Sequence, residues 1–284
     1  MRIFVTGAGG QVGHEVAARF HAAERHTVVA ADHATLDVGD RDAVLQAITS
    51  TRPDVVVHCA AWTAVDACEG DPDRAFLVNA LGTRYVAEAC ARTDAHLITI
   101  STDYVFDGDQ PEPYVEWDRP NPRSVYGRSK LASETEAAGC TSATVVRTSW
   151  VCGAYGANMV KTILRLAAEH DTLTFVDDQR GHPSFADDLA VMLERFAIDR
   201  RPGVFHVTNQ GAVSWYEFAR EVLSAAGLDA DRVKPISTAE LTPPRPAPRP
   251  RNSVLDNAAL RLGGVPLLPD FREPLSRLVK QLTA

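Results

Sequence analysis

Three residues that could move a proton stand in the middle of the chain: Thr102, Tyr126 and Lys130. Residues four apart lie on one face of a helix, so a helical segment would point Tyr126 and Lys130 into the same space. An ammonium beside a phenol favours the phenolate. We therefore expect Lys130 to lower the pKa of Tyr126 from ~10 toward the range useful for acid–base catalysis. Thr102 follows the apolar strand predicted at 97–100 and brings a hydroxyl to its end. A chance Tyr–Lys pair is the competing explanation, which the surrounding motifs make less attractive.

A glycine-rich turn near the N-terminus is typical of dinucleotide binding. Gly7, Gly10 and Gly13 follow a short strand predicted at 3–6, and a helical pattern covers 15–23. Glycines at this spacing let the backbone turn tightly and approach a pyrophosphate at the start of a helix. A plain structural turn is the alternative, but the position between the first strand and the first helix favours a nucleotide site.

The ends of the next two predicted strands offer further contacts for a nucleotide. Asp32 ends the strand at 27–31, and an acid at this distance from the glycines typically hydrogen-bonds ribose hydroxyls. No Arg is adjacent to it, which favours NADH over NADPH, whereas an ordinary acidic loop residue is the alternative. The strand at 55–58 ends in small residues, Ala60 and Ala61 among them, which leave room for a cofactor.

Strands and helices alternate from residue 1 to about 150, which predicts an α/β fold built on a doubly wound parallel Rossmann sheet. We expect a dinucleotide-binding domain at 1–150 that is completed by about 183–212. The segments 151–182 and 213–284 then form a smaller α/β substrate-binding region. Within the first domain, one long helix is expected at 74–92.

Two features of the second half suggest substrate contacts. The segment 242–251 contains five prolines in ten residues, which favours an extended path. It is either a solvated linker or a rigid arm whose Arg245, Arg249 or Arg251 meets a diphosphate. Trp150, at the edge of a predicted strand, is either a platform for the substrate or part of the core.

Composition excludes several classes of function. The chain has 284 residues, of which 45% are hydrophobic and 23% charged, as in ordinary globular proteins. A formal net charge of −8 argues against a nucleic-acid partner, which needs a basic face. The five cysteines are odd in number and form no Cys-x-x-Cys pair, which favours reduced thiols in a cytoplasmic protein. No apolar run reaches about 18 residues, so we expect no membrane span.

The motifs together resemble those of the dTDP-4-dehydrorhamnose reductases, a family of extended short-chain dehydrogenases. The most specific match is Ser-Thr-Asp-Tyr-Val-Phe-Asp-Gly at 101–108, followed by Tyr-Gly-Arg-Ser-Lys-Leu-Ala at 126–132. The resemblance covers nearly the whole chain. Further matching segments are 7–13, 60–66, 147–151, 177–179 with 182–183, and 249–253.

This resemblance implies reduction of the C4 keto group of dTDP-4-dehydro-L-rhamnose to dTDP-L-rhamnose, with NADPH or NADH as the cofactor. Carried over by position, Tyr126 is the general acid, Lys130 is its electrostatic partner and a ribose ligand, and Thr102 holds the substrate oxygen. Asp103 and Trp150 face the sugar. The residues expected to contact the nucleotide are Gly10, Gln11, Val12, Asp32, Asp37, Val38, Ala61 and Thr63.

Some relatives are described as dimers in which carboxylates of both chains bind Mg²⁺. Glu15 stands at a matching position, but Gln281 occupies the place of the second carboxylate. This departure argues against Mg²⁺ and against a metal-bridged dimer. We therefore assign no metal ligand and expect a monomer or a homodimer.

Three alternative functions belong to the same fold. The 4,6-dehydratases carry a Glu after the Thr-Asp pair, whereas Tyr104 stands here, so dehydration lacks its base. A sibling 4-ketoreductase of antibiotic deoxysugar synthesis has no feature in this sequence that excludes it. A non-catalytic protein, like the regulatory subunit of methionine adenosyltransferase, is less consistent with intact Thr102, Tyr126 and Lys130.

Overall fold

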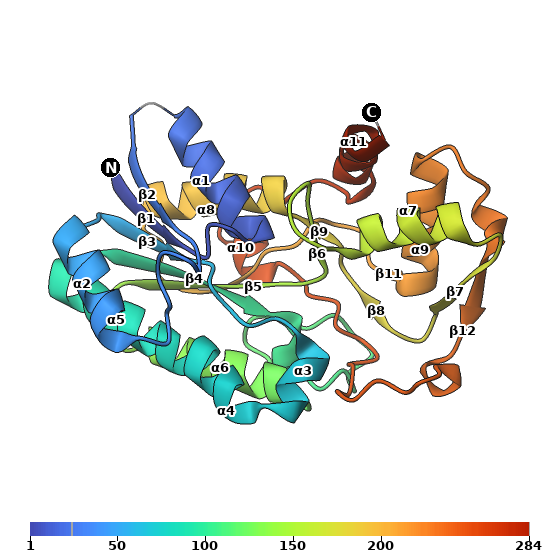
Figure 1. Ribbon diagram of the computed structural model, residues 1–284, viewed down its shortest axis with the longest axis horizontal. Coiled ribbons are helices and arrows are strands. Elements are labelled where there is room, and N and C mark those ends of the chain that lie inside the picture. Colours follow the sequence, from blue (N-terminus) through green and yellow to red (C-terminus); the bar gives the residue numbers. More distant parts are fainter. Residues whose placement is uncertain (24, 284) are drawn as a thin grey trace.

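A six-stranded parallel sheet organises the N-terminal part of the molecule (Figure 1). The computed structural model describes residues 1–23 and 25–283. The strand order is β10-β5-β4-β3-β1-β2, and all five strand pairs are parallel. The strands are β1 (Arg2–Thr6), β2 (Thr27–Ala31), β3 (Val55–His58), β4 (His96–Thr102), β5 (Ala143–Thr148) and β10 (Gly203–His206). This architecture confirms the predicted doubly wound α/β fold.

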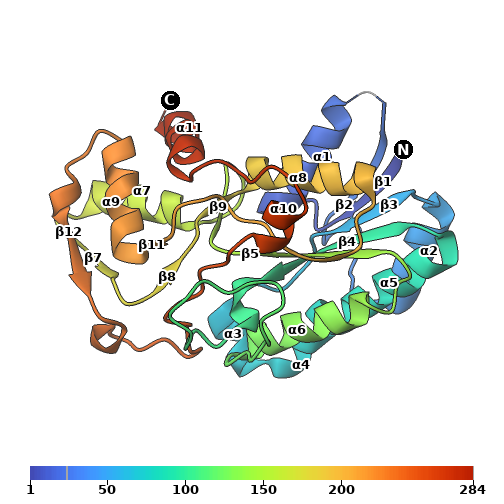
Figure 2. The same ribbon diagram turned by 180° about the vertical axis from the view of Figure 1, so that it is seen from behind.

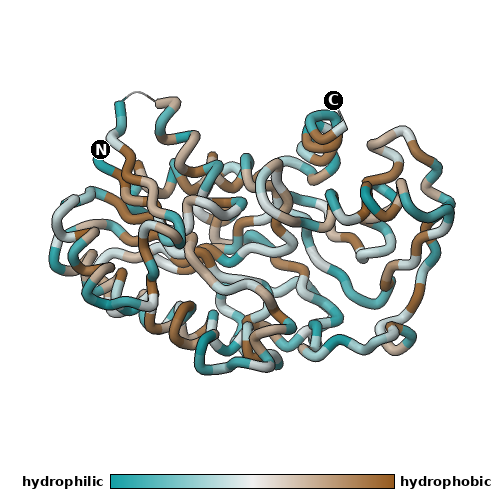
Figure 3. Tube along the Cα trace, in the orientation of Figure 1, coloured by the Kyte–Doolittle hydropathy of each residue, from teal (hydrophilic) through white to brown (hydrophobic). Residues whose placement is uncertain are grey.

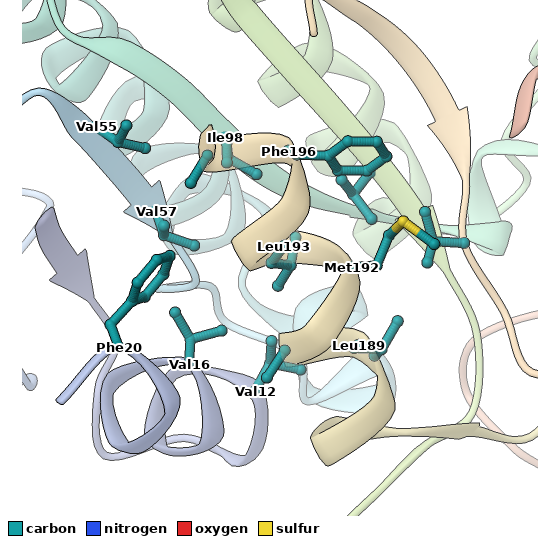
Figure 4. Close-up of a cluster of buried hydrophobic side chains, with 14 of the residues drawn as sticks. Val12, Val16, Phe20, Val55, Val57, Ile98, Leu189, Met192, Leu193 and Phe196 are labelled. Atoms are coloured by element: carbon teal, nitrogen blue, oxygen red, sulfur yellow. The ribbon is translucent and has the colours of Figure 1, made fainter. Parts of the chain in front are cut away.

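Helices cover both faces of the sheet, which explains why its strands are continuous apolar runs. The helices α1 (Gln11–Ala22) and α8 (Ala186–Asp199) pack on one face, where Val16, Phe20 and Leu193 lie in the core (Figure 4). The opposite face carries a second core, to which helices α2 (Arg41–Thr51), α5 (Gly82–Thr93) and α6 (Val125–Ala137) contribute. Figure 3 shows hydrophobic positions along the strands between these layers.

Two expected helix boundaries were wrong. Helix α1 begins at Gln11, not at 15, because the last glycine of the turn already lies inside the helix. The helix expected at 74–92 is divided into α4 (Pro72–Phe76), a π-helical segment at Leu77–Leu81, and α5. A π-helical turn of this kind inserts one extra residue and is often found at functional sites.

The second region lies beyond the carboxyl ends of the sheet strands (Figures 1 and 2). It has its own hydrophobic core. The helices that contribute to this core are α7 (Met159–Glu169), α9 (Trp215–Ala225) and α11 (Arg272–Thr283). Short strands complete it: β7 (Leu173–Val176) pairs with β12 (Val233–Ile236), β8 (Arg180–Gly181) with β11 (Val213–Ser214), and β6 (Val151–Cys152) with β9 (Ser184–Phe185).

After β12 the chain returns toward the sheet as a strap, residues 237–255, which opens with a 3₁₀ turn at Thr238–Glu240 and includes the proline-rich segment (Figure 2). The short helix α10 (Ala258–Leu262) follows, and its Leu260 joins the core beneath α8. Across the described ranges, none of the helices combines the length and apolar character that crossing a bilayer requires.

Candidate active site

Backbone contact places the catalytic candidates together at the end of β4. The strand ends at Thr102 and continues into a 3₁₀ turn at Asp103–Val105. Helix α6 starts against this turn: a Cβ on Gly127 would lie only 2.2 Å from the carbonyl oxygen of Tyr104. Only a glycine permits such an approach, which brings Tyr126 against the turn. The rings of Tyr104 and Tyr126 meet edge to face, with centroids 5.6 Å apart.

Hydrogen bonds fix the first turns of α6. The Ser124 hydroxyl caps the helix by accepting from the Gly127 N–H at 3.0 Å. The Glu69 carboxylate accepts from the Val125 N–H at 2.7 Å. Ser129 donates to the Tyr126 carbonyl at 2.8 Å, which ties the segment together before Lys130. The helix therefore presents its catalytic face in one orientation.

A buried ion pair anchors the far end of the same helix to the sheet. Arg147 of β5 donates to both carboxylate oxygens of Glu134, at 2.9 and 2.8 Å. Ser101 of β4 donates to Glu134 as well, at 2.5 Å. Both charged side chains are more than nine-tenths buried. The ion pair thus holds α6 in register with the two strands that end at the site.

The pKa of Tyr126 is raised, so the expectation of a lowered value was wrong. Burial penalises the phenolate most strongly, and a hydrogen bond with Thr102 only partly offsets it. Lys130 is itself 3% exposed. Burial lowers its pKa to about 8, opposed by the Glu134 carboxylate. Burial dominates because both groups lie inside the protein, which spacing along a helix does not reveal. At neutral pH Tyr126 therefore holds its proton and can donate it.

A cavity of about 600 Å³ opens at the carboxyl ends of β1 and β3, where the strand order reverses. This is the position at which doubly wound sheets bind nucleotides. Gly7 has a φ of +66°, and a Cβ there would lie 2.5 Å from the Ala60 nitrogen. The ends of β1 and β3 therefore lie in backbone contact, and no side chain at Gly7 fills the space above them. Seven of the predicted cofactor residues line the cavity: Gly7, Gly10, Asp32, Asp37, Val38, Ala60 and Ala61.

These residues fit a nicotinamide dinucleotide. Asp32 accepts hydrogen bonds from the Thr35 N–H at 2.9 Å and from its hydroxyl at 2.8 Å, and the hydroxyl bond is the main cause of the lowered pKa of this carboxyl group. The carboxylate therefore stays ionised at the rim of the cavity. It is ready to accept from ribose hydroxyls.

The other six predicted nucleotide contacts lie outside the cavity lining, and two of them are Tyr126 and Lys130 of α6. Val12 is buried in the core under α1. Gly13 is packed against the Gly7 carbonyl, which a Cβ would approach to 2.2 Å. The Gln11 side chain donates to the Val151 carbonyl at 3.3 Å, and Thr63 is exposed. Their roles as nucleotide ligands remain predictions.

The structure also shows two residues near the cavity that sequence reasoning missed. The Arg74 guanidinium lies over the Trp62 ring, 4.5 Å from its centroid, and both residues line the cavity. Asn79, in the π-helical segment, accepts from the Trp62 N–H at 2.7 Å and donates to its carbonyl at 3.2 Å. It donates also to Ser129 at 2.9 Å, which links this loop to α6. No local sequence signal marks a π-helical turn.

Trp150 lies in an aromatic stack at the boundary of the second region. Its ring is parallel to that of Trp215, with centroids 3.6 Å apart, and it also packs near Phe218. The indole covers Gly181, where a Cβ would meet it at 2.8 Å. Trp150 has a φ of +46°, a conformation that bulky residues rarely adopt. A sugar platform and a packing role are both compatible with this position.

The strap is anchored through Asp66 of helix α3 (Val65–Gly70). Arg249 donates to both of its carboxylate oxygens, at 2.5 and 2.8 Å. The Ala247 N–H adds a bond of 3.1 Å, and the exposed Arg245 lies at 3.4 Å. Arg249 also lies near Tyr104. Burial lowers the pKa of the Arg249 guanidinium, but the hydrogen-bonded Asp66 carboxylate opposes this effect, and the pKa is raised. Asp66 thus holds the proline-rich part of the strap beside the catalytic turn, and backbone bonds such as that from the Ser253 N–H to the Arg180 carbonyl, at 2.8 Å, hold its later part.

The residues around Glu15 do not fit a Mg²⁺ site within one chain. Glu15, Asp187 and Gln281 line a cavity of about 220 Å³ together with Arg277. Arg277 donates to Asp187 at 3.0 Å, so a cation already occupies the carboxylate's neighbourhood. Among residues 1–23 and 25–283, no group of three or more His, Cys, Asp or Glu side chains is arranged to hold a metal.

Comparisons with known proteins identify the family of the chain. The model of the family described as the RmlD substrate binding domain matches residues 1–284. The chain is 42% identical over 282 residues to a dTDP-4-dehydrorhamnose reductase of Mycolicibacterium smegmatis, covering 98% of this chain and 85% of the relative. It is 40% identical over 289 residues to a probable dTDP-4,6-dihydroxy-2-methyloxan-3-one 4-ketoreductase of Streptomyces antibioticus, covering 100% and 96%.

A crystal structure gives the same result. The dTDP-4-dehydrorhamnose reductase of Bacillus anthracis, solved in complex with NADP, superposes with a TM-score of 0.94 at 38% identity. The match covers 99% of each chain, so both regions of the fold are shared.

Proposed function

Since this chain belongs to the family of dTDP-4-dehydrorhamnose reductases, we propose that it reduces the C4 keto group of dTDP-4-dehydro-L-rhamnose to a hydroxyl, giving dTDP-L-rhamnose. The observation that carries this proposal is the position of Tyr126, a buried and protonated phenol held against Thr102 at the end of β4. That strand end lies beside the nucleotide cavity of the sheet. A protonated phenol is what a ketone reduction needs, because the substrate oxygen must gain a proton.

A bound nicotinamide cofactor supplies the hydride to the C4 carbon. Tyr126 then donates its phenolic proton to the substrate oxygen as negative charge develops there. Lys130 follows one helical turn later on the same face of α6, and its ammonium stabilises the phenolate that remains. Tyr126 and Lys130 are both more than nine-tenths buried, so the transfer takes place away from bulk water.

For the cofactor we infer NADH or NADPH, bound in the cavity between Gly7, Asp32 and Ala60. Asp32 favours free ribose hydroxyls because a carboxylate repels a 2′-phosphate. The NADP complex of the B. anthracis relative supports the phosphorylated cofactor instead. Both cofactors therefore belong in the assay.

For the substrate we infer that the diphosphate lies near Arg249 and the sugar near Asp103 and Trp150. Arg249 brings a guanidinium charge close to the catalytic turn, and its two bonds to Asp66 fix its position, so a diphosphate would share this guanidinium with Asp66. The enzyme acts as a monomer or homodimer, and the five free cysteines support a reducing, cytoplasmic location.

A second candidate is a sibling 4-ketoreductase that accepts a related dTDP-4-keto sugar. The S. antibioticus relative, similar over the whole chain, favours this possibility. The same catalytic residues would serve both reactions, so only the substrate distinguishes them.

The test follows NAD(P)H oxidation with a panel of dTDP-4-keto sugars. We expect turnover with dTDP-4-dehydro-L-rhamnose and a kcat reduced by roughly 10²–10⁴-fold in Tyr126→Phe, with cofactor affinity little changed. Near-normal turnover of Tyr126→Phe would refute the assigned acid. Turnover of a different sugar only would select the sibling function, and stable co-purification with a larger enzyme without turnover would indicate a non-catalytic subunit.

A further inference from the structure

The single hydroxyl proton of Thr102 is already committed. Its Oγ1 donates to Oδ1 of Asp103 at 2.9 Å and accepts from the Tyr104 N–H at 3.2 Å. A hydroxyl has one donor and two acceptor positions. With its proton on Asp103, Thr102 can only accept in its hydrogen bond with Tyr126, and it cannot donate one to a substrate oxygen. The role implied for Thr102, holding the C4 oxygen, requires that its proton be released from Asp103.

Asp103 is placed where a carboxylate is costly. Its side chain is 2% exposed, and its Oδ2 has no hydrogen-bond partner among residues 1–23 and 25–283. Burying an ionised carboxylate with one oxygen left without a partner is unfavourable. Burial accordingly raises the pKa of Asp103 to about 6, and the Ser253 and Thr102 hydroxyls offset this only in part.

Negative charge on Asp103 also opposes the reaction. The carboxylate raises the pKa of Tyr126 on α6 and that of Tyr104 in its own turn, because it disfavours a second negative charge nearby. The strap and α3 contribute the Arg249–Asp66 pair, whose charges largely cancel. An ionised Asp103 would disfavour an alkoxide at the C4 oxygen for the same reason.

A protonated Asp103 removes both obstacles. Its acid O–H donates to Oγ1 of Thr102, and the Thr102 proton then points away from Asp103 and toward the site. The protonated Asp103 carries no charge. The negative charge that develops on the substrate oxygen is then stabilised by hydrogen bonds from two neutral donors, Thr102 and Tyr126. No proton leaves Asp103 during the reaction, and the proton that the product gains still comes from Tyr126.

We propose that Asp103 is a positioning residue that works in its protonated form, directing the Thr102 hydroxyl toward the C4 oxygen; this inference rests on the proposed function. The experiment compares kcat against pH in the wild type, Asp103→Asn and Asp103→Leu. The amide of Asn is uncharged and its N–H can donate to Thr102, whereas Leu has a similar shape and cannot donate.

We expect kcat of the wild type to fall up to tenfold per pH unit as Asp103 ionises, because kcat reports groups of the enzyme–substrate complex. Asp103→Asn should lack this fall and exceed the wild type at high pH, and Asp103→Leu should lose at least ~10-fold in kcat at every pH. Unchanged melting temperatures would show that folding is not the cause. Identical pH profiles of the wild type and Asp103→Asn, or equal losses in Asn and Leu variants, would overturn the inference.

A second measurement is independent of turnover. The infrared carbonyl band of a protonated carboxyl group should be present in the wild type near pH 6 and should titrate over the range where kcat falls. A wild type without such a band at that pH would contradict the inference even if the variants do not fold. If instead the wild type reduces none of the keto sugars, the proposed function fails, while the part of the band that is lost in Asp103→Asn still reports the protonation of Asp103.

Discussion

Replacing Gly127 with Ala tests whether backbone contact between α6 and the catalytic turn sets the geometry of the site. A helical Gly→Ala change normally stabilises by about 1 kcal/mol. Here the new Cβ would lie 2.2 Å from the Tyr104 oxygen, whereas real Cβ contacts stay above 3.0 Å. The helix must therefore move by 3.0 − 2.2, or about 0.8 Å. Overpacking costs about 1–3 kcal/mol, so the net loss of stability is only about 0–2 kcal/mol.

The same displacement should be far more damaging to catalysis. A shift near 1 Å can cost about 10²-fold in rate when it misplaces a reacting group, and Tyr126 adjoins the altered residue. We expect kcat to fall by about 10²-fold with little change in melting temperature or cofactor KM. Gly70→Ala is the matched control, because nothing lies within 4 Å of a Cβ at that position. Normal kcat in Gly127→Ala would refute the claim that this contact positions the acid.

Three further predictions concern the cofactor, the strap and Lys130. Because Asp32 repels a 2′-phosphate, kcat/KM with NADH should at least equal kcat/KM with NADPH. A strong preference for NADPH would show that the Asp32 side chain points away from the 2′ position of the bound cofactor. In calorimetric titrations with dTDP, Arg249→Ala should lose about 1.5–3 kcal/mol of binding free energy, and the exposed Arg245→Ala should lose less than about 1 kcal/mol. If Arg245→Ala, Arg249→Ala and Arg251→Ala all bind dTDP as well as the wild type, the role of the strap is purely structural. Since lysine is charged below its pKa, which burial lowers to about 8, kcat/KM should fall more steeply once pH rises through 8, in addition to the fall that Asp103 causes at lower pH. Lys130→Arg, always charged, should lack this second fall, and a wild-type profile without it up to about pH 9.5 would contradict the role.

Much of the nucleotide-binding half could be predicted from the sequence because its signals are local. Parallel strands buried on both faces are short apolar runs, and the Gly7 turn stands directly between a strand and a helix. Asp32 and Ala60 follow from their positions at strand ends. The π-helical segment around Asn79 could not be predicted, since an extra residue in a helix changes no pattern of side chains. Arg74 could not be predicted because its place in the cavity wall, over the Trp62 ring, depends on the fold and not on a local pattern.

The chemistry of the site depends on properties that spacing does not carry. Tyr126 and Lys130 were identified by being four residues apart, yet the direction of the Tyr126 pKa shift follows from burial by segments distant in sequence. The raised pKa of Asp103 also results from burial by a distant segment. Ser253 of the strap, more than 140 residues later in the chain, lies against this carboxyl group. The sequence motif thus names the reacting groups, whereas the packing of the strap and of α6 against one turn decides which of them hold protons. Substitutions in those packed segments should therefore change the pH dependence of the enzyme more than its affinity for the cofactor.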